Sequence, residues 1–388
     1  MKSGEFFRQA GRSGLWPQAA AVHRSAVTKA RGKIEWRIFR DILNNAVRLA
    51  YEVWPEAPEF VWHGMSVFAI DGSRYTLPAY QEIRDKFDPK SGLQHPGKGH
   101  FPMCLVSTVY DVFRRLPIAR TVVPVDSSER EEAKELLPCI PAHSVLLFDR
   151  GYPSFELIRY LFRHFDGWFV FRCAAKSTFP AIEQFLKSGK AQADIWINPS
   201  NNYLSQIPSD KRKRVKAVKL RVVRLEAPDG RVSVLLTNLY NKKLFAADHL
   251  IDLYFRRWEV ESYYRDEKTV LAIESFHSRT CNGIYQELFA AVIMSVISRT
   301  LMQLSSQHFL DTFRECQFKN AVMTLASEAA VLSPENPEKA IRIFDDILKE
   351  IYRVIYYRPK KPRPGRPRVT KRGYNKWTIG KAKKAANA

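Results

Sequence analysis

Two aspartates in similar surroundings are the first residues of this chain that could do chemistry. Asp71 follows the apolar run VFAI, Asp149 follows VLLF, and a glycine comes within two residues of each. Either pattern alone is typical of a turn after a strand. If the two strands are neighbours, however, the carboxylates repel each other in a dry environment unless a cation lies between them. Mg²⁺ or Mn²⁺, which prefer oxygen ligands, would satisfy such a pair.

A site that holds two metal ions for phosphoryl transfer commonly needs a third carboxylate. The stretch YFRRWEVESYYRDEK (254–268) offers four candidates, Glu259, Glu261, Asp266 and Glu267. At about 100° per residue of helix, Glu261 shares one face with a tyrosine and three cations, and the other three carboxylates lie opposite. The residues on the face of Glu261 are Tyr254, Arg257, Arg265 and Lys268.

A lone carboxylate among cations and a phenol fits a site that handles phosphate. The cations and the hydroxyl can hold phosphate oxygens while Glu261 completes the shell of a metal ion. The same spacing also suits a solvent-exposed helix in which Glu261 pairs with Arg257 or Arg265 at i,i+4. Helical geometry alone leaves both interpretations open.

The segments around these residues predict the elements that must position them. Residues 66–78 read as a strand, an Asp-Gly turn and a second strand. Residues 103–125 read as two strands around a turn at Asp111, and residues 127–137 as a helix with glutamates in its first turn. Residues 144–162 read as a buried strand, a charged turn and a helix.

The rest of the chain adds a strand at 168–173, short β segments over 177–235 and helices from about residue 240 to 357. A helix with an apolar face is expected from Glu35 to Ala50. This order predicts an α/β protein with a mixed sheet core, an inserted β-rich unit and a helical C-terminal part.

Composition favours a polyanionic partner, because the net charge is +22 and the pI is about 9.8. The five cysteines are scattered without a CxxC pair, so we expect reduced thiols and neither disulfides nor a zinc site. The longest apolar run, at 288–294, is shorter than the roughly 20 residues of a membrane span. With no signal-peptide pattern at the N-terminus, we expect a soluble, cytoplasmic protein without a membrane partner.

Two basic segments could contact DNA directly. DKRKRVKAVKLR (210–221) is either a solvated hairpin or a groove that follows a phosphate backbone. The stretch 358–384 has no acidic residue and many prolines and glycines, so we expect the tail to be disordered alone. Its RPGRPR motif (363–368) resembles the core of an A·T hook, although it also fits a generic polybasic tail.

The same candidate residues carry a family resemblance. Tyr254-x2-Arg257-x3-Glu261-x6-Lys268 matches the Tyr-Arg-Glu-Lys signature of bacterial insertion-sequence transposases of the DDE type, the insertion sequence 4 family. DGSRYTLP at Asp71 and FDRGYPS at Asp149 are similar to that family's first and second Asp segments. The similarity extends over about residues 65–300.

The resemblance implies a ribonuclease-H-like fold with a β insertion between the second Asp and the Glu. It implies that Asp71, Asp149 and Glu261 bind two Mg²⁺ (or Mn²⁺) ions and are the catalytic residues. It further implies that Tyr254, Arg257 and Lys268 contact phosphates of the transposon end. Arg265, which the signature does not include, is expected to be a secondary DNA contact.

The expected organisation divides the chain into four consecutive parts. A basic helical region (1–64) precedes a catalytic domain (65–300) that contains a β-rich insertion (about 177–235). C-terminal helices (301–357) and a basic disordered tail (358–388) follow.

The activity that the resemblance implies is nicking at the transposon's 3′ ends and attack of the freed 3′-OH on target DNA. The implied partners are double-stranded DNA, as terminal inverted repeats and as target, and a second copy of the chain in a synaptic complex. Two alternatives stay open at this point. One is a nuclease of the same fold that cuts without joining, and the other is a domesticated or defective copy that binds DNA without catalysis.

Overall fold

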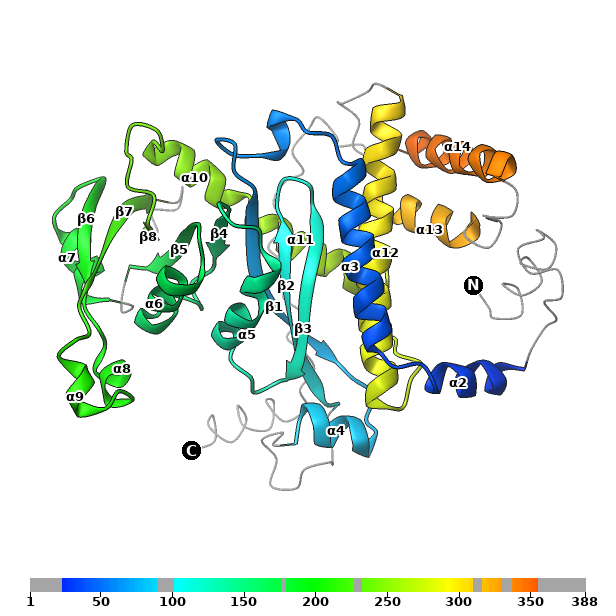
Figure 1. The fold of residues 1–388 in the computed structure, drawn as a ribbon, viewed down its shortest axis with the longest axis horizontal. Helices are drawn as coiled ribbons and strands as arrows, with labels where there is room; N and C mark the ends of the chain where they lie inside the picture. The colour runs from blue at the N-terminus through cyan, green and yellow to red at the C-terminus, as the bar shows by residue number, and fades with distance from the viewer. Residues whose placement is uncertain are drawn as a thin grey trace, which may run out of the picture.

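The computed structural model of the chain describes residues 23–89, 101–175, 179–226, 232–309, 316–328 and 337–354. The expected disordered tail at 358–388, with its RPGRPR motif, lies outside these ranges, and so do residues 1–22. The described chain is elongated, with a central sheet, an inserted unit at one end and C-terminal helices at the other (Figure 1).

Within the described residues, eight strands form a single mixed sheet in the order β3-β2-β1-β4-β5-β8-β7-β6. Strands β1 to β3 form an antiparallel meander, and β4 and β5 run parallel to β1. This five-strand arrangement is the ribonuclease-H-like core that the resemblance implies, so the predicted fold class is confirmed. The strands are β1 (Val67–Thr76), β2 (Met103–Asp111), β3 (Leu116–Pro124), β4 (Val145–Phe148), β5 (Trp168–Ala174), β6 (Gln192–Ile197), β7 (Val218–Glu226) and β8 (Val232–Thr237).

The hairpin predicted at residues 66–78 is wrong. Asp71 and Gly72 lie inside the single strand β1, where they pair with Thr108 and Ser107 of β2. Strand β2 continues beside β1 over the whole length of that strand, so its ladder hydrogen bonds keep the Asp-Gly pair extended. The turn predicted at Asp111 is confirmed, because β2 ends there and β3 begins at Leu116.

The inserted segment continues the central sheet. Its strand β8 pairs antiparallel with β5, and β7 and β6 follow outward in the same sheet. The segment also contains short helices where mostly β structure was expected over 177–235. These helices are α7 (Pro180–Lys187), α8 (Asn201–Ser205) and α9 (Ser209–Arg212). The insertion is therefore an α/β extension that shares backbone pairing with the core.

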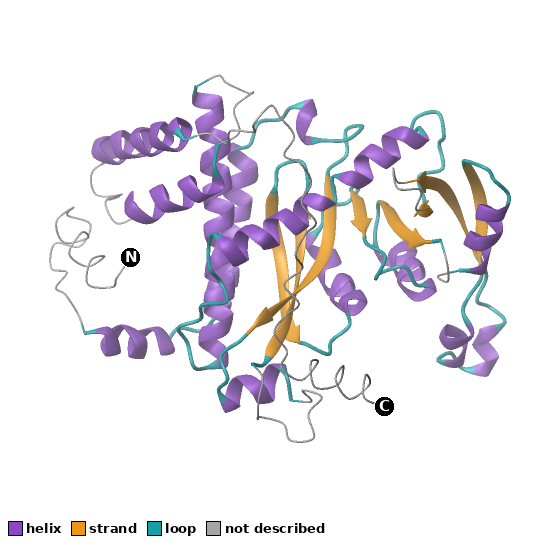
Figure 2. Ribbon diagram, turned by 180° about the vertical axis from the view of Figure 1, so that it is seen from behind, coloured by secondary structure: helices purple, strands orange, loops and turns teal. Residues whose placement is uncertain are grey.

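Helices cover both faces of the core strands. Helix α5 (Glu129–Leu136) packs on one face of β1 to β3, and α11 (Trp258–Thr269) crosses the other face (Figures 1 and 2). Side chains from strands that are buried on both faces fill the space between these layers, as in the fully buried β4. The remaining helices near the core are α4 (Gln81–Phe87), α6 (Phe155–His164) and α10 (Ala247–Phe255).

Helix α12 (Cys281–His308) connects the core to the C-terminal helices. It packs beside α3 (Arg37–Val53) and, further along, against α13 (Phe318–Glu328) and α14 (Pro337–Arg353) (Figure 1). Its first part belongs to the main hydrophobic core and its end to a second cluster around Leu301 and Ile347. The expected domain division at residue 300 therefore falls within a continuous helix.

Helix α12 is long and apolar enough to cross a membrane, with a mean hydropathy of 1.5 in its most apolar window. However, 61% of that window is buried inside the protein. Packing against α3, α13 and α14 accounts for its apolar character.

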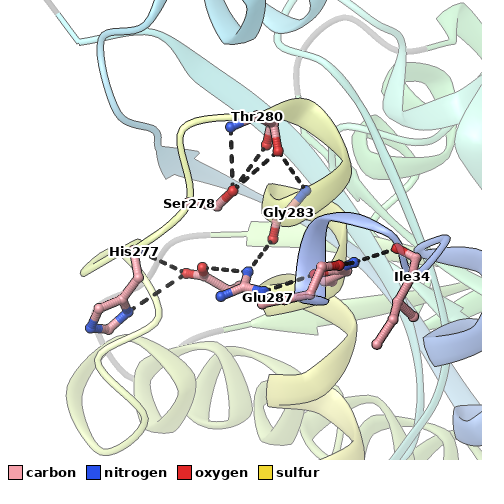
Figure 3. Close-up of polar contacts among 8 residues, drawn as sticks. Ile34, His277, Ser278, Thr280, Gly283 and Glu287 are labelled. Atoms are coloured by element: carbon pink, nitrogen blue, oxygen red, sulfur yellow. Dashed lines mark hydrogen bonds and ion pairs between the residues drawn. The ribbon is translucent and has the colours of Figure 1, made fainter. Parts of the chain in front are cut away.

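The helix α2 (Arg24–Gly32) is fastened to the start of α12 by polar contacts (Figure 3). The Arg31 guanidinium donates to the Glu287 carboxylate at 2.7 Å, and the Gln286 amide donates to the Ile34 carbonyl at 2.6 Å. The backbone N–H of His277 donates to the second oxygen of Glu287 at 2.9 Å. The described end of the N-terminal region is thus held against the start of α12.

Candidate active site

Asp71 and Asp149 lie side by side at the carboxyl end of β4. Strands β1 and β4 are parallel, and Ile70 pairs with Phe148, so Asp71 is the next residue of β1 and Asp149 is the first residue after β4. Strand β4 ends at Phe148, whereas β1 continues beside β2 alone. The neighbouring strands expected from the sequence are therefore present, and ligand sites commonly form where parallel strands end.

Burial raises the pKa of Asp71 to about 7. The Arg257 guanidinium and the Gly72 N–H, which donates to Asp71 Oδ1 at 3.0 Å, oppose this rise. The charges of Asp149 and Glu261 add to it. The three candidate carboxylates thus act on one another electrostatically, as expected of acids that share a site.

Glu261 lies in the first turn of α11, and a two-residue break separates this helix from α10. The single helix assumed over 254–268 is therefore wrong. Arg256 and Arg257 nevertheless keep right-handed helical dihedral angles, with φ of −61° and −54°. Because the backbone stays helical across the break, Arg257 and Glu261 remain one turn apart on the same face.

The side chain of Arg257 lies between the carboxylates. Only 1% of the residue is exposed. Its Nη2 donates to Glu261 Oε1 at 2.6 Å, and its Nη1 lies 3.7 Å from Asp71 Oδ2. Burial lowers the pKa of Arg257, but its neighbours Tyr254 and Asp149, together with Glu261 and Asp71, raise it above its ordinary value. The guanidinium is therefore a permanent internal counter-charge for the site.

Two nitrogens of Arg257 have unused hydrogen-bonding capacity. Among the described residues, neither Nε nor Nη1 has a hydrogen-bond partner, although both atoms are buried. A buried guanidinium N–H without an acceptor is unfavourable, so these atoms are suited to an anionic group that enters the site.

Tyr254 is fully buried beside this arginine. Its hydroxyl donates to the Phe148 carbonyl at 3.4 Å, next to Asp149, and the Arg257 guanidinium lies 5.9 Å from its ring centre. Burial raises the pKa of Tyr254 above its ordinary value. In this structure the phenol therefore links α10 to the end of β4, and its expected contact with phosphate stays a prediction.

The other two predicted DNA contacts are nearer the surface. Lys268 donates from Nζ to the Arg74 carbonyl at 2.7 Å and lies 4.6 Å from the ring centre of Tyr75. Arg265 is exposed, and its guanidinium donates to the Ser262 hydroxyl at 2.8 Å. The predicted face of 254–268 thus has a buried part around Arg257 and an accessible part around Arg265 and Lys268.

The carboxylates on the opposite side of α11 have structural partners. Glu267 is fully buried, accepts from Arg120 Nη2 at 2.7 Å and from the Tyr263 hydroxyl at 2.7 Å, and also accepts from Tyr75. Glu259 pairs with Arg115 at 3.2 Å, and Asp266 pairs with Arg299 at 2.9 Å. These pairs attach α11 to β3 and α12.

No group of three His, Cys, Asp or Glu side chains in the described part of the chain is placed closely enough to enclose a metal ion. The donor set nevertheless fits a hard divalent cation, because Asp71, Asp149 and Glu261 supply carboxylate oxygens and all three act electrostatically on one guanidinium. Mg²⁺ is usually held by one or two protein carboxylates together with water, so a closed cage of three is not required.

Sequence reasoning missed two residues at this site. Glu129, the first residue of α5, lies against Gly72 and close to Gly151. Tyr152 is buried nearby and its hydroxyl has no hydrogen-bond partner among the described residues. The sequence around Glu129 indicates only a helix start, because its position against Gly72 depends on the packing of α5 on the sheet.

Comparison with known proteins identifies the family of this chain. The family model described as the transposase DDE domain matches residues 62–297. A relative named transposase InsG for insertion sequence element IS4, from Escherichia coli (strain K12), is 24% identical over 292 residues, which cover 74% of this chain. A putative transposase InsZ from the same strain is 26% identical over 140 residues, or 35% of this chain.

A probable transposase for insertion sequence element IS5377, from Geobacillus stearothermophilus, is 36% identical over 81 residues, or 21% of this chain. The aligned regions span 63%, 44% and 21% of the lengths of these three relatives. Among solved structures, a piggyBac transposase synaptic complex with hairpin DNA has a TM-score of 0.41 at 11% identity, covering 77% of this chain and 59% of that one.

Proposed function

This chain belongs to the transposase DDE domain family, and on that premise we propose that it is the transposase of a bacterial insertion sequence. It would nick the ends of the element and join the freed 3′-OH to target DNA. The observation that carries the proposal is the convergence of Asp71, Asp149 and Glu261 on the buried Arg257. Members of this family use divalent metal ions, and their substrate is DNA.

Asp71, Asp149 and Glu261 are the residues that would hold two Mg²⁺ (or Mn²⁺) ions. Bound there, the ions would polarise the scissile phosphate and activate the attacking water or 3′-OH. The three carboxylates supply oxygen donors from the region of two parallel strands and from one helix. Because these elements are rigid parts of the core, the donors are presented from a fixed frame.

Arg257 and Tyr254 would orient the site from within. The bond from Arg257 to Glu261 fixes the direction of that carboxylate, and Nε and Nη1 of Arg257, which have no hydrogen-bond partner among the described residues, can donate to a phosphate oxygen. Lys268 and Arg265, which are nearer the surface, would contact the DNA backbone beyond the reacting phosphate. These roles of the four residues are part of the proposed function.

A cleft between the core and the inserted unit supports DNA as the partner. It has a volume of about 460 Å³ and lies between α6 and the start of β7. Its lining in the described structure contains arginines, lysines and aromatic side chains but no carboxylate. The cationic side chains are Arg159, Arg163, Arg214, Lys216 and Lys219. This cleft includes part of the basic segment 210–221, which the sequence left open as hairpin or groove.

Two ends of an element must be processed together, so we further propose that the chain acts on DNA as a homodimer. The partners would be the terminal inverted repeats and the target duplex. We expect this reaction to occur in the bacterial cytoplasm, at the nucleoid.

The deciding experiment is strand transfer with a pre-cleaved end duplex, a plasmid target and Mg²⁺. We expect joined product with the wild-type protein and none with Asp149→Asn or Glu261→Gln, while both variants retain duplex binding. Cleavage without joining would favour the nuclease alternative. Duplex binding by the wild type without any chemistry would favour a defective copy, and activity that survives Glu261→Gln would refute the site.

A further inference from the structure

Glu129 occupies an unusual position next to the two aspartates of the candidate site. A Cβ atom built on Gly72 would lie 3.0 Å from the Glu129 carboxyl carbon, and one built on Gly151 would lie 3.8 Å from its Oε2. Gly72 follows Asp71 directly, and Gly151 is two residues after Asp149. The carboxylate of Glu129 therefore approaches the backbone beside both aspartates, and a side chain at position 72 would press against it.

The side chain of Glu129 forms no hydrogen bond or ion pair within the described ranges of the chain. The next residue, Arg130, donates from Nε to the Gly151 carbonyl at 2.9 Å, which fixes the start of α5 against the turn after β4. The helix is therefore attached through Arg130, and the Glu129 carboxylate lies against Gly72 without a partner among the described residues. Like charges placed together without a partner are unfavourable unless a cation joins them.

Tyr152 provides a second, independent observation. It is 1% exposed, yet its hydroxyl has no hydrogen-bond partner among the residues described. Burial is the main cause that raises the pKa of Tyr152, and the charges of Asp71, Glu129 and Asp149 and the nearby Tyr264 raise it further. The three carboxylates therefore lie within electrostatic range of this phenol. A buried O–H without an acceptor costs free energy, and a water molecule at the site would satisfy it.

We propose that Glu129 is a fourth carboxylate of the site. It would bind the metal through water, by holding water ligands of a divalent ion at Asp71 and Asp149, and the Tyr152 hydroxyl would help to hold the same water molecules. This inference rests on the proposed function. Mg²⁺ retains several water molecules when bound to protein, and hydrogen bonds from the surrounding residues orient them. Glu129 would accept hydrogen bonds from these water molecules, and the Tyr152 hydroxyl would form a hydrogen bond with one of them.

The test is Mn²⁺ binding to the full, DNA-free chain, followed by the electron paramagnetic resonance signal of free Mn²⁺. We expect Glu129→Gln to raise the Kd for Mn²⁺ by about tenfold and Asp149→Asn to raise it at least as much. The matched control is Glu131→Gln on the same helix, because Glu131 is 56% exposed and pairs with Lys134. This control should leave the Kd unchanged.

Tyr152→Phe separates a metal-binding role from a structural one. Removing an unsatisfied buried hydroxyl should raise the thermal midpoint of the metal-free protein. The same variant should weaken Mn²⁺ binding by about threefold, since water ligands lose one hydrogen-bond partner. A merely structural residue would not change the two quantities in opposite directions.

The outcomes distinguish the inference from the function on which it rests. If Asp149→Asn weakens Mn²⁺ binding but Glu129→Gln does not, the fourth carboxylate is refuted and the three-carboxylate site stands. If Glu129→Gln and Glu131→Gln weaken binding equally, the effect is general charge and the inference fails. If no variant weakens binding, the proposed metal site itself is refuted.

Discussion

At the scale of single residues, Asp71 carries the clearest electrostatic signature. Its pKa is raised from 3.8 to about 7 by burial. A raised pKa in the folded state contributes stability that is complete below the unfolded value and is lost as the pH rises through the folded one. The metal-free protein should therefore lose stability between about pH 4 and pH 7 because Asp71 ionises.

Asp71→Asn tests this directly, because the amide does not ionise. At pH 8 the variant should be more stable than the metal-free wild type by roughly 3 kcal/mol, and the difference should shrink at pH 5. Urea unfolding at the two pH values measures it. A constant difference across this range would contradict the assignment. Adding about 10 mM Mg²⁺ should reduce the stability advantage of the variant at pH 8, because the ion would bind and stabilise the ionised wild type.

Arg257 belongs to the same scale, since it is the internal cation between Asp71 and Glu261. Arg257→Met leaves those carboxylates without their counter-charge and should destabilise the metal-free protein by about 3 kcal/mol. Added Mg²⁺ should recover more stability in this variant than in the wild type. Equal Mg²⁺ effects on the thermal midpoints of the two proteins would show that the guanidinium does not compensate the site.

At the scale of elements, the pair of Glu267 and Arg120 attaches α11 to β3 inside the core. Both side chains are fully buried and 2.7 Å apart. Glu267→Gln leaves Arg120 as an uncompensated buried charge, so we expect a loss of about 3–5 kcal/mol in the free energy of unfolding. Glu259→Gln on the same helix removes a partly exposed pair and should cost less than about 1 kcal/mol. Similar losses in both variants would contradict this difference.

The elements also show what sequence reasoning could reach. Strands β4 and β5 and helices α5 and α6 were predictable because their apolar runs and periods are local signals. The extended course of Asp71 and Gly72 was not, because it depends on pairing with β2, more than thirty residues away. The grouping of Arg257 with Glu261 followed from helical geometry, but the burial of Arg257 and Glu267 depends on β1, β3 and β4, which a single helical face does not reveal.

At the scale of the whole molecule, the basic cleft between α6 and β7 should supply non-specific affinity for DNA. Arg163 and Lys216 both line this cleft, and replacing both by glutamine should weaken duplex binding about tenfold. The dependence of log Kd on log salt concentration should become shallower by the equivalent of roughly two phosphate contacts. Lys187→Gln, together with Lys190→Gln, makes the same change in charge on the inserted unit outside the cleft. Fluorescence anisotropy at several salt concentrations measures both, and an equal weakening would assign the effect to net charge.

The continuous sheet has a consequence for where the DNA is cut. Because β5 and β8 are joined by backbone hydrogen bonds, the inserted unit and the strands that carry Asp71 and Asp149 cannot slide past each other. A duplex seated in the basic cleft would therefore meet the carboxylates at a constant number of nucleotides from its anchored phosphates. The sheet would act as a spacer of fixed length between the anchored phosphates and the position of cleavage.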